Sequence, residues 1–274
     1  MKKLICTLLS LVLILTCASA MAEDASLTDI QTKGKFIMGF DEAYPPMGFV
    51  DENTGDYTGF DIDLAKEVAK RLNVELVLQP IAWDSKELEL NNKNIDCIWS
   101  GMTITAARQE QMRFSIPYLA NQQILVVRSG SGVDEFAELT GAVLGTQAGS
   151  ASVDVLNANA DLQAMVGEPM LYDDFVTALM DLQLGGIDVL LIDSVVGNYY
   201  ISLMEDPDNF FVMPEILQAE EYGIGFSLGD EALANAVNEQ LIAMENDGTI
   251  EALALKWFGE DTTLIAQYAG EYTK

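Results

Sequence analysis

Short apolar runs alternate with polar or amphipathic runs along most of the chain. Runs of strand length lie at 35–40, 74–78, 95–99, 124–127, 143–146 and 187–192. Helices are expected at 61–72, 84–90, 173–184, 194–204 and from Val153 onward, with Asp61 as the N-cap of the first. Alternating strands and helices predict an α/β fold with sheets that are rich in parallel strands.

The stretch from Ile95 to Arg108 has the pattern of a ligand-binding loop. A strand ends at Ser100-Gly101, the hydroxyls of Thr103 and Thr105 follow, and Arg108 is the first cation after them. Strand ends that carry carbonyls, hydroxyls and a guanidinium are common ligand sites in open α/β sheets, and a carboxylate suits the arginine. The alternative is a surface loop with a solvated arginine.

Three other strand ends carry candidate binding groups. Asp41 and Tyr44 follow the first strand and precede the rigid Pro45-Pro46 pair. The run from Gln147 to Ser152 opens a helix, so its N–H groups form a potential anion nest. Asp193 ends the 187–192 strand. The simpler interpretations are solvated loops for the first two, and for Asp193 an N-cap of the next helix.

The amino terminus has the pattern of a secretory signal peptide. Lys2 and Lys3 precede an apolar run at 4–15, and Ala18-Ser19-Ala20 supplies a cleavage site. We therefore expect an exported protein, periplasmic or at the cell surface, that begins after Ala20. Cys17 leaves a lipid-anchored alternative open. No later run is long enough to span a bilayer.

The composition excludes several functions. The formal net charge is −29, and it becomes −31 once the signal peptide with its two lysines is removed. So acidic a protein is a poor partner for nucleic acid or anionic membranes. The chain has no histidine, and Cys97 is the one cysteine after the signal peptide. These counts argue against a histidine-based triad, a metal site and an internal disulfide, and we expect no cofactor and no bound metal.

Several segments occur in a familiar order: the helix at 59–72, Ser100-Gly101-Met102-Thr103-Ile104-Thr105 with Arg108, Tyr222-Gly223-Ile224-Gly225-Phe226, and the closing segments Asn246-Asp247-Gly248-Thr249 and Lys256-Trp257-Phe258-Gly259. Together they resemble the family 3 extracellular solute-binding proteins, the polar amino-acid receptors of ABC importers. The resemblance extends from about residue 30 to residue 259.

The resemblance implies an α/β, two-lobe, periplasmic-binding-protein-like type II fold with two hinge crossings. Lobe 1 would contain residues 27–117 and 223–258, and lobe 2 would contain residues 123–217. The hinge segments would be 118–122 and 218–222, and 259–274 would form a C-terminal tail. The ligand would lie in the cleft between the lobes.

The resemblance also assigns the groups that hold a zwitterion. Arg108 would bind the α-carboxylate together with the backbone near Thr103 and Ser152. The α-ammonium would be held by Asp193, the Gly101 carbonyl and the Thr103 hydroxyl. A ligand held by Arg108 of lobe 1 and Asp193 of lobe 2 would favour closure of the lobes.

The side-chain end of the pocket would be framed by Asp41, Tyr44, Trp83 and Gln147. Ala151 stands where many relatives have threonine or glycine, and relatives vary with their ligand at the position of Gln147. Two aromatic walls and an amide suit a polar L-amino acid. We expect neutral glutamine- or cystine-like ligands slightly ahead of cationic ones, and acidic ligands last because Asp41 would repel them.

The function implied is a non-enzymatic, monomeric binding protein that delivers a polar L-amino acid to the permease subunits of an ABC transporter. Three alternatives stay open. A catalytic relative of the same fold, such as a dehydratase, would need a general acid, for which Asp41, Glu42 or Asp193 are candidates. The others are a ligand-sensing domain and a structural or adhesion protein.

Overall fold

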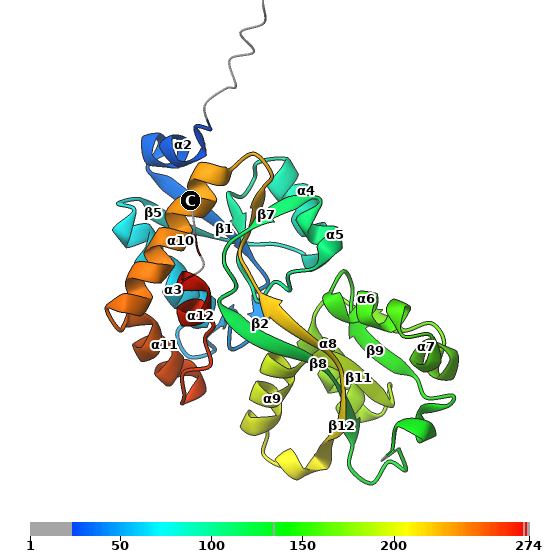
Figure 1. The fold of residues 1–274 in the computed structure, drawn as a ribbon. Coiled ribbons are helices and arrows are strands. Elements are labelled where there is room, and N and C mark those ends of the chain that lie inside the picture. The colour runs from blue at the N-terminus through cyan, green and yellow to red at the C-terminus, as the bar shows by residue number, and fades with distance from the viewer. Residues whose placement is uncertain (1–23, 134, 271, 273–274) are drawn as a thin grey trace, which may run out of the picture.

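The computed structural model describes residues 24–133, 135–270 and 272. The predicted signal peptide, its cleavage site and Cys17 lie outside the described residues. The described chain forms two α/β lobes, which confirms the predicted fold class (Figure 1). Two long strands, β8 (Leu119–Arg128) and β12 (Phe210–Tyr222), run side by side from one lobe into the other. No described helix combines the length and apolar character needed to cross a membrane.

Lobe 1 is built around a five-stranded sheet with strand order β5-β1-β6-β13-β7. β1 is parallel to β5 and β6, whereas β13 is antiparallel to β6 and β7. A three-stranded hairpin sheet, β2-β3-β4, lies beside it and has its tip at 53–56. The strands are β1 (Lys35–Phe40), β2 (Ala43–Tyr44), β3 (Gly48–Val50), β4 (Tyr57–Thr58), β5 (Glu75–Pro80), β6 (Cys97–Ile98), β7 (Met112–Phe114) and β13 (Gly225–Ser227).

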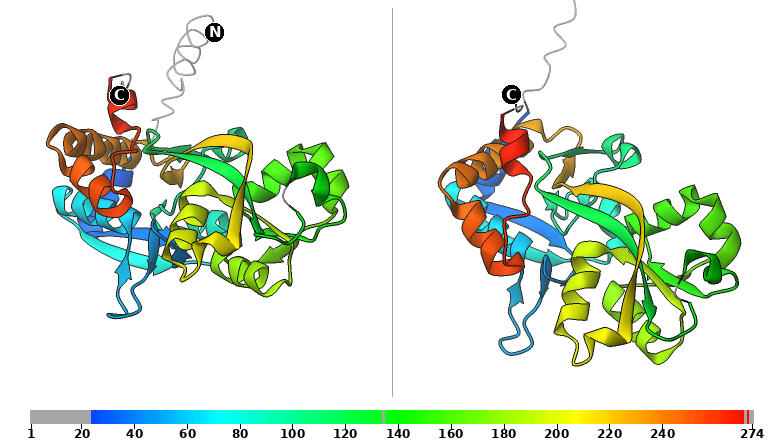
Figure 2. Two further views of the ribbon diagram at one scale, coloured as in Figure 1. Left: turned by 90° about the horizontal axis from the view of Figure 1, so that it is seen from below. Right: turned by 60° about the horizontal axis from the view of Figure 1, so that its bottom comes forward.

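Helices cover the lobe 1 sheet, and the chain returns to it after β12 (Figure 2). The carboxyl-terminal helices therefore pack against helices from the first third of the chain, as α10 does against α2 and α3. The helices are α2 (Ser26–Lys33), α3 (Phe60–Arg71), η1 (Trp83–Ser85), α4 (Lys86–Asn91), α5 (Ala106–Gln109), α10 (Glu231–Asn246), α11 (Thr249–Phe258) and α12 (Ile265–Ala269).

Lobe 2 is built around a second five-stranded sheet, in which β10, β9 and β11 are parallel and β8 and β12 run antiparallel. The remaining elements are β9 (Leu144–Gln147), β10 (Met170–Tyr172), β11 (Val189–Asp193), α6 (Ala151–Ala158), α7 (Ala160–Val166), α8 (Phe175–Leu184), α9 (Ser194–Leu203), η2 (Phe136–Leu139) and η3 (Pro207–Asn209). Lobe 1 and lobe 2 are the parts of the molecule around the two sheets. The residue bounds of the lobes and of the hinge segments stay predictions.

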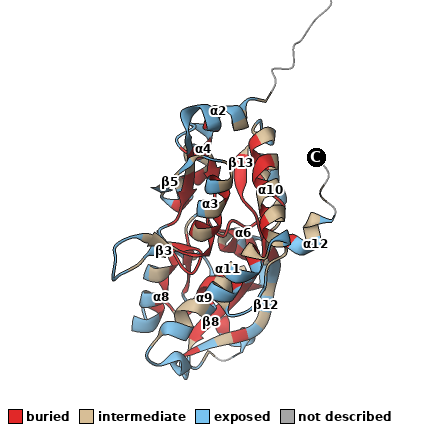
Figure 3. Ribbon diagram, turned by 90° about the vertical axis from the view of Figure 1, so that its left-hand side faces the viewer, coloured by how far each residue is buried: buried red, intermediate tan, exposed pale blue. Residues whose placement is uncertain are grey.

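The inner strands are buried on both faces, as expected for parallel strands covered by helices. All five residues of β11 are buried, and Phe36, Met38 and Phe40 of β1 are fully buried. Figure 3 shows the buried strands inside, while the helices around them have exposed outer faces. Burial of these apolar side chains supplies the main stabilising term for each lobe.

Several predicted element boundaries were wrong, and two of them lie in lobe 1 close to the site. α3 begins at Phe60 with Gly59 as its N-cap, and Asp61 is buried instead of capping. Its Oδ2 accepts hydrogen bonds from the Gly101 N–H at 2.8 Å and the Tyr118 hydroxyl at 2.9 Å. Gly59 has φ +141°, and a Cβ there would lie 2.2 Å from the Met47 carbonyl oxygen. The predicted strand at 95–99 is reduced to Cys97–Ile98.

Candidate functional site

Strands of both sheets point their carboxyl ends at the boundary between the lobes. Asp41 follows β1 of lobe 1, whereas Gln147 and Asp193 end β9 and β11 of lobe 2. The Gln147 Nε2 donates to Asp41 Oδ2 at 2.7 Å, so the two lobes are in direct contact there. The arrangement is the one in which α/β proteins place ligands.

Arg108 is a buried cation in lobe 1 that reaches lobe 2. Thr105 caps α5 by accepting a hydrogen bond from the Arg108 N–H at 3.2 Å. The guanidinium donates to the Thr103 carbonyl at 2.9 Å through Nη1 and to the Gly149 carbonyl at 3.3 Å through Nη2. Arg108 is 8% exposed, and no described carboxylate lies within ion-pair distance of it. Its charge is therefore available to an anionic ligand.

Asp193 is a buried anion in lobe 2. It occupies the N-cap position of α9, but its side chain makes no capping hydrogen bond and points instead to other partners. Its Oδ1 accepts hydrogen bonds from Tyr222 Oη at 2.9 Å, from Gln123 Nε2 at 3.0 Å and from Asn121 Nδ2. Burial raises the pKa of Asp193 to about 7, with a further upward contribution from the charge of Glu220.

Glu220 is a second buried carboxylate beside Asp193, and the sequence analysis missed it. The Asn121 Nδ2 and Gln123 Nε2 groups each donate to Glu220 Oε2 at 3.0 Å as well as to Asp193. Two amide groups thus join two carboxylates. Neither acid makes an ion pair with any described residue. The available signal was the placement of Asn121 and Gln123 on one face of a strand, two positions apart.

The other residues assigned to the α-carboxylate and α-ammonium lie next to this network. Thr103 Oγ1 donates to Glu220 Oε2 at 3.0 Å, and Ser152 Oγ donates to Gln123 Oε1 at 2.6 Å. Gly101 has φ +53°, and a Cβ there would lie 2.5 Å from the Tyr44 ring. Glycine is therefore required where the loop after β6 passes close to the Tyr44 ring.

Tyr44 is buried behind the site. Its hydroxyl lies 3.0 Å from the Tyr222 hydroxyl, and its ring lies 6.1 Å from the ring of Phe175 in lobe 2. Tyr44 therefore couples the hairpin sheet of lobe 1 to Asp193 through Tyr222. Tyr44 does not line the cavity that lies beside Asp41.

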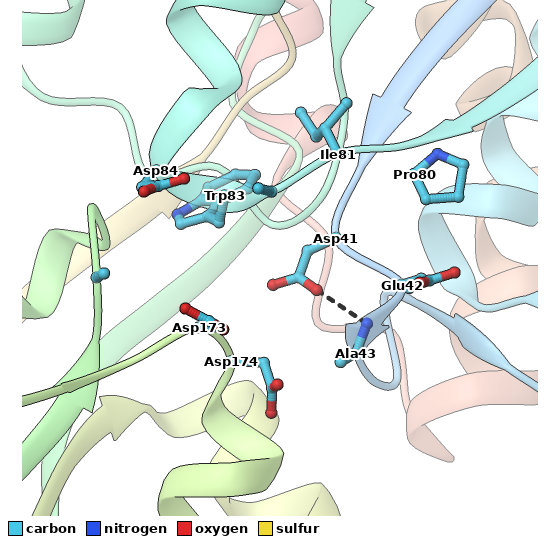
Figure 4. A pocket seen from close by; sticks show the side chains of 11 residues that line it. Asp41, Glu42, Ala43, Pro80, Ile81, Trp83, Asp84, Asp173 and Asp174 are labelled. Carbon is cyan, nitrogen blue, oxygen red and sulfur yellow. Dashed lines mark hydrogen bonds between the residues drawn. The ribbon is translucent and has the colours of Figure 1, made fainter.

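A cavity of about 380 Å³ lies between the lobes beside Asp41 (Figure 4). Trp83 forms one wall, and Asp41 lies between Trp83 and the segment that carries Asp173 and Asp174. The lining residues come from 41–43, 80–84, Ala148 and 173–174. Of the nine residues predicted for the site, Asp41 and Trp83 line this cavity, and the other seven surround the interlobe hydrogen-bond network.

Asp41 is the buried acid of the cavity. Its Oδ1 accepts the Ala43 N–H at 2.9 Å, and its own N–H donates to Ser100 Oγ at 3.1 Å. Burial raises the pKa of Asp41 to about 6, and the charges of Asp174 and Glu42 raise it further.

Lys86 is a second buried cation near Arg108 that the sequence analysis did not assign to the site. Its ammonium donates to the Gly149 carbonyl at 2.8 Å and to the Trp83 carbonyl at 3.1 Å. It lies 3.2 Å from a Glu87 oxygen and 4.8 Å from the centre of the Trp83 ring. The Gly149 carbonyl of lobe 2 thus accepts hydrogen bonds from two cations of lobe 1. The described residues contain no group of three or more acidic or cysteine side chains placed to hold a metal ion.

Comparisons with known proteins place this architecture in a family. The L-cystine-binding protein TcyJ of Escherichia coli K12 is 32% identical over 246 residues, covering 89% of this chain and 90% of TcyJ. A histidine-bound ABC-transporter substrate-binding protein from Streptococcus pneumoniae is 36% identical with a TM-score of 0.85, covering 89% of this chain and 99% of that one.

A solved arginine-bound protein is 27% identical with a TM-score of 0.82, and the match covers 89% of this chain and 98% of that one. Residues 36–260 match the family described as bacterial extracellular solute-binding proteins, family 3. The chain therefore belongs to the family 3 bacterial extracellular solute-binding proteins.

Proposed function

We propose that this protein captures a polar L-amino acid between its lobes, through Arg108 and Asp193, and delivers it to an ABC importer. The observation that carries the proposal is a pair of buried, opposite charges, Arg108 in lobe 1 and Asp193 in lobe 2, neither of which pairs with a charged group of the described chain. Buried charges are costly unless they are paired. A zwitterion supplies the carboxylate that one lacks and the ammonium that the other lacks.

The hydrogen-bond partners suit these roles. The Arg108 guanidinium already uses Nη1 and Nη2 on carbonyls at the two sides of the cleft, so it is held in place to donate to a carboxylate. The N-terminus of α6 beyond Gly149 offers backbone N–H groups to the same anion. Asp193 and Glu220 provide the negative charge for the ammonium.

The wider role follows from the family. The relatives are a cystine-binding protein and ABC-transporter proteins solved with histidine or arginine. We infer that this chain is likewise a binding protein and not an enzyme, that it acts as an exported monomer, and that permease subunits are its partners. Cleavage after Ala20 or lipid attachment at Cys17 would decide whether it is free or anchored.

Arg108→Ala tests the carboxylate role. Calorimetry with an amino-acid panel should show a loss of affinity of about 100-fold or more, because a buried carboxylate would lose a charge-assisted partner. Arg113→Ala, which removes a partly exposed arginine paired with Glu231, is the matched control and should bind normally. Circular dichroism checks that both variants are folded. Affinity kept within about threefold in Arg108→Ala would exclude the carboxylate assignment.

Asp193→Asn tests the ammonium role. An amino acid should lose about tenfold or more in affinity, whereas its deaminated analogue should lose little, because the analogue has no ammonium to be neutralised. Equal losses for the two ligands would show that Asp193 supports the fold of the cleft and does not contact the ammonium.

A further inference from the structure

The cavity beside Asp41 is lined by carboxylates and by no basic residue. Five of its lining residues are acidic: Asp41, Glu42, Asp84, Asp173 and Asp174. None of the five makes an ion pair with a described residue. They come from both lobes, since Asp173 and Asp174 lie between β10 and α8 and the others follow β1 and β5. Closing the lobes therefore brings like charges together.

Local structure accounts for part of this charge. Asp174 caps α8 by accepting the Thr177 N–H at 2.7 Å, and Glu42 accepts the Tyr57 hydroxyl at 3.0 Å. Asp173 has no such structural role, because its carboxylate accepts no hydrogen bond from the described residues. Asp41 accepts the Ala43 N–H and a Gln147 amide N–H, but it makes no ion pair with a described residue. It is 6% exposed and faces the cavity between Trp83 and Asp174 (Figure 4).

Lys86, a basic side chain that contacts the Trp83 wall of the cavity, already has other partners. Lys86 is not a lining residue, and its ammonium contacts Gly149, Trp83 and Glu87. The carboxylates of the cavity thus have no cationic partner among the residues that the structure describes. A cation between Asp41 and the Asp173-Asp174 segment would offset their mutual repulsion in the closed state.

Gln147 also argues against a neutral amide ligand. Both N–H bonds of its amide are used, one to Asp41 Oδ2 at 2.7 Å and one to the Asp173 carbonyl at 3.0 Å. What remains for a ligand is the Oε1 acceptor, together with the carboxylate acceptors around it. Acceptors recognise a side chain that only donates, which describes an ammonium or a guanidinium.

We propose that the amino acid bound here has a positively charged side chain, which lies in the acidic cavity against Trp83, with Asp41, Asp173 and Asp174 as its specificity-determining residues. This inference rests on the proposed amino-acid function. It reverses the order expected from the sequence, which placed neutral ligands slightly ahead of cationic ones, and it keeps acidic ligands last.

The sharpest test compares L-arginine with L-citrulline, which has nearly the same shape and no side-chain charge. Calorimetry on the mature chain should show arginine, or lysine for the shorter cation, binding about tenfold or more tightly than citrulline, as expected for charge-assisted hydrogen bonds. Raising the salt concentration should weaken arginine more than citrulline. Glutamine, cystine and glutamate complete the panel.

Variants test which residues cause the preference for arginine over citrulline. Asp174→Asn keeps a good N-cap and removes the charge, and Asp173→Asn and Asp41→Asn remove the other two. Each should reduce the ratio of arginine to citrulline affinity, and the triple variant should bring it below about threefold. Asp56→Asn removes an exposed acid at the hairpin tip, outside the cavity, and should leave the ratio unchanged.

The outcomes are distinguishable. Citrulline equal to arginine, or glutamine, cystine or glutamate binding most tightly, would overturn the cationic class while leaving the amino-acid function intact. If no amino acid bound to the wild-type protein, the proposed function itself would fail.

Discussion

At the scale of single residues, Asp193 and Glu220 share two amide donors and make no ion pair with a described residue. Because the pKa of Asp193 is raised to about 7, the carboxyl group is protonated in part of the molecules at pH 7. An ammonium placed beside it favours the charged carboxylate and lowers that pKa. We therefore predict that binding at pH 7 releases protons, and that affinity rises as the pH is raised from about 6 to 8.

Calorimetry in two buffers with different ionisation enthalpies measures this release directly. Glu220→Gln removes the neighbouring charge, so it should lower the pKa of Asp193 and reduce the protons released at pH 7. Asp193→Asn should abolish the part that Asp193 contributes. If the observed binding enthalpy is the same in both buffers, Asp193 does not change its protonation on binding and the prediction is wrong.

The sequence predicted some of these residues and missed others for a physical reason. A ligand site at the carboxyl ends of the strands can be expected from the chain pattern alone, and the strand or loop ends carry Asp41, Arg108, Gln147 and Asp193. Glu220 lies within a strand, and its role depends on the pairing of β12 with β8, which places it opposite Asn121. Pairing between segments about 100 residues apart cannot be read from local periodicity.

At the scale of elements, the loop between β9 and α6 is held by two cations of lobe 1. Lys86 and Arg108 both donate to the Gly149 carbonyl, and these bonds require the lobes to be close. Lys86→Met keeps the aliphatic length and removes the donor. We predict that it weakens ligand affinity about tenfold, mainly through faster dissociation, because the closed state loses a charge-assisted bond.

Stopped-flow binding separates the two rate constants. Lys66→Met is the matched control, since Lys66 is an exposed lysine on α3. The control should leave both rate constants unchanged. An unchanged dissociation rate in Lys86→Met would mean that the contact between Lys86 and Gly149 does not stabilise the closed state.

Most elements were predictable, but their ends were less so. β1 was predicted at its observed bounds, 35–40, because its apolar run ends at the Asp41 loop. α6 begins at Ala151, two residues before the predicted start, and β8 begins at Leu119, five residues before it. β8 extends because Leu119 to Gln123 pair with β12, from Tyr222 to Gln218. The first five residues of β8 include polar residues, so this part of the strand does not form an apolar run.

At the scale of the whole molecule, the two lobes are linked by the paired strands β8 and β12 and bring acidic residues to both sides of one cavity. Repulsion between Asp41 of lobe 1 and the Asp173-Asp174 segment of lobe 2 opposes closure, whereas a zwitterion held by Arg108 and Asp193 favours it. The equilibrium between the open and closed arrangements of the lobes should therefore depend on ligand and on pH.

Small-angle X-ray scattering can follow this closure. We predict that the radius of gyration of the wild-type protein at pH 7.5 decreases when a binding amino acid is added, because the ligand contacts both lobes and binds the closed state more tightly. Without ligand, lowering the pH to about 5 should also favour the compact form, since protonation of Asp41 removes charge from the cavity. Asp41→Asn should be more compact than the wild type at pH 7.5 without ligand and should respond less to pH. A radius of gyration that stays constant with ligand, although calorimetry shows binding, would mean that binding and closure are not coupled in this protein.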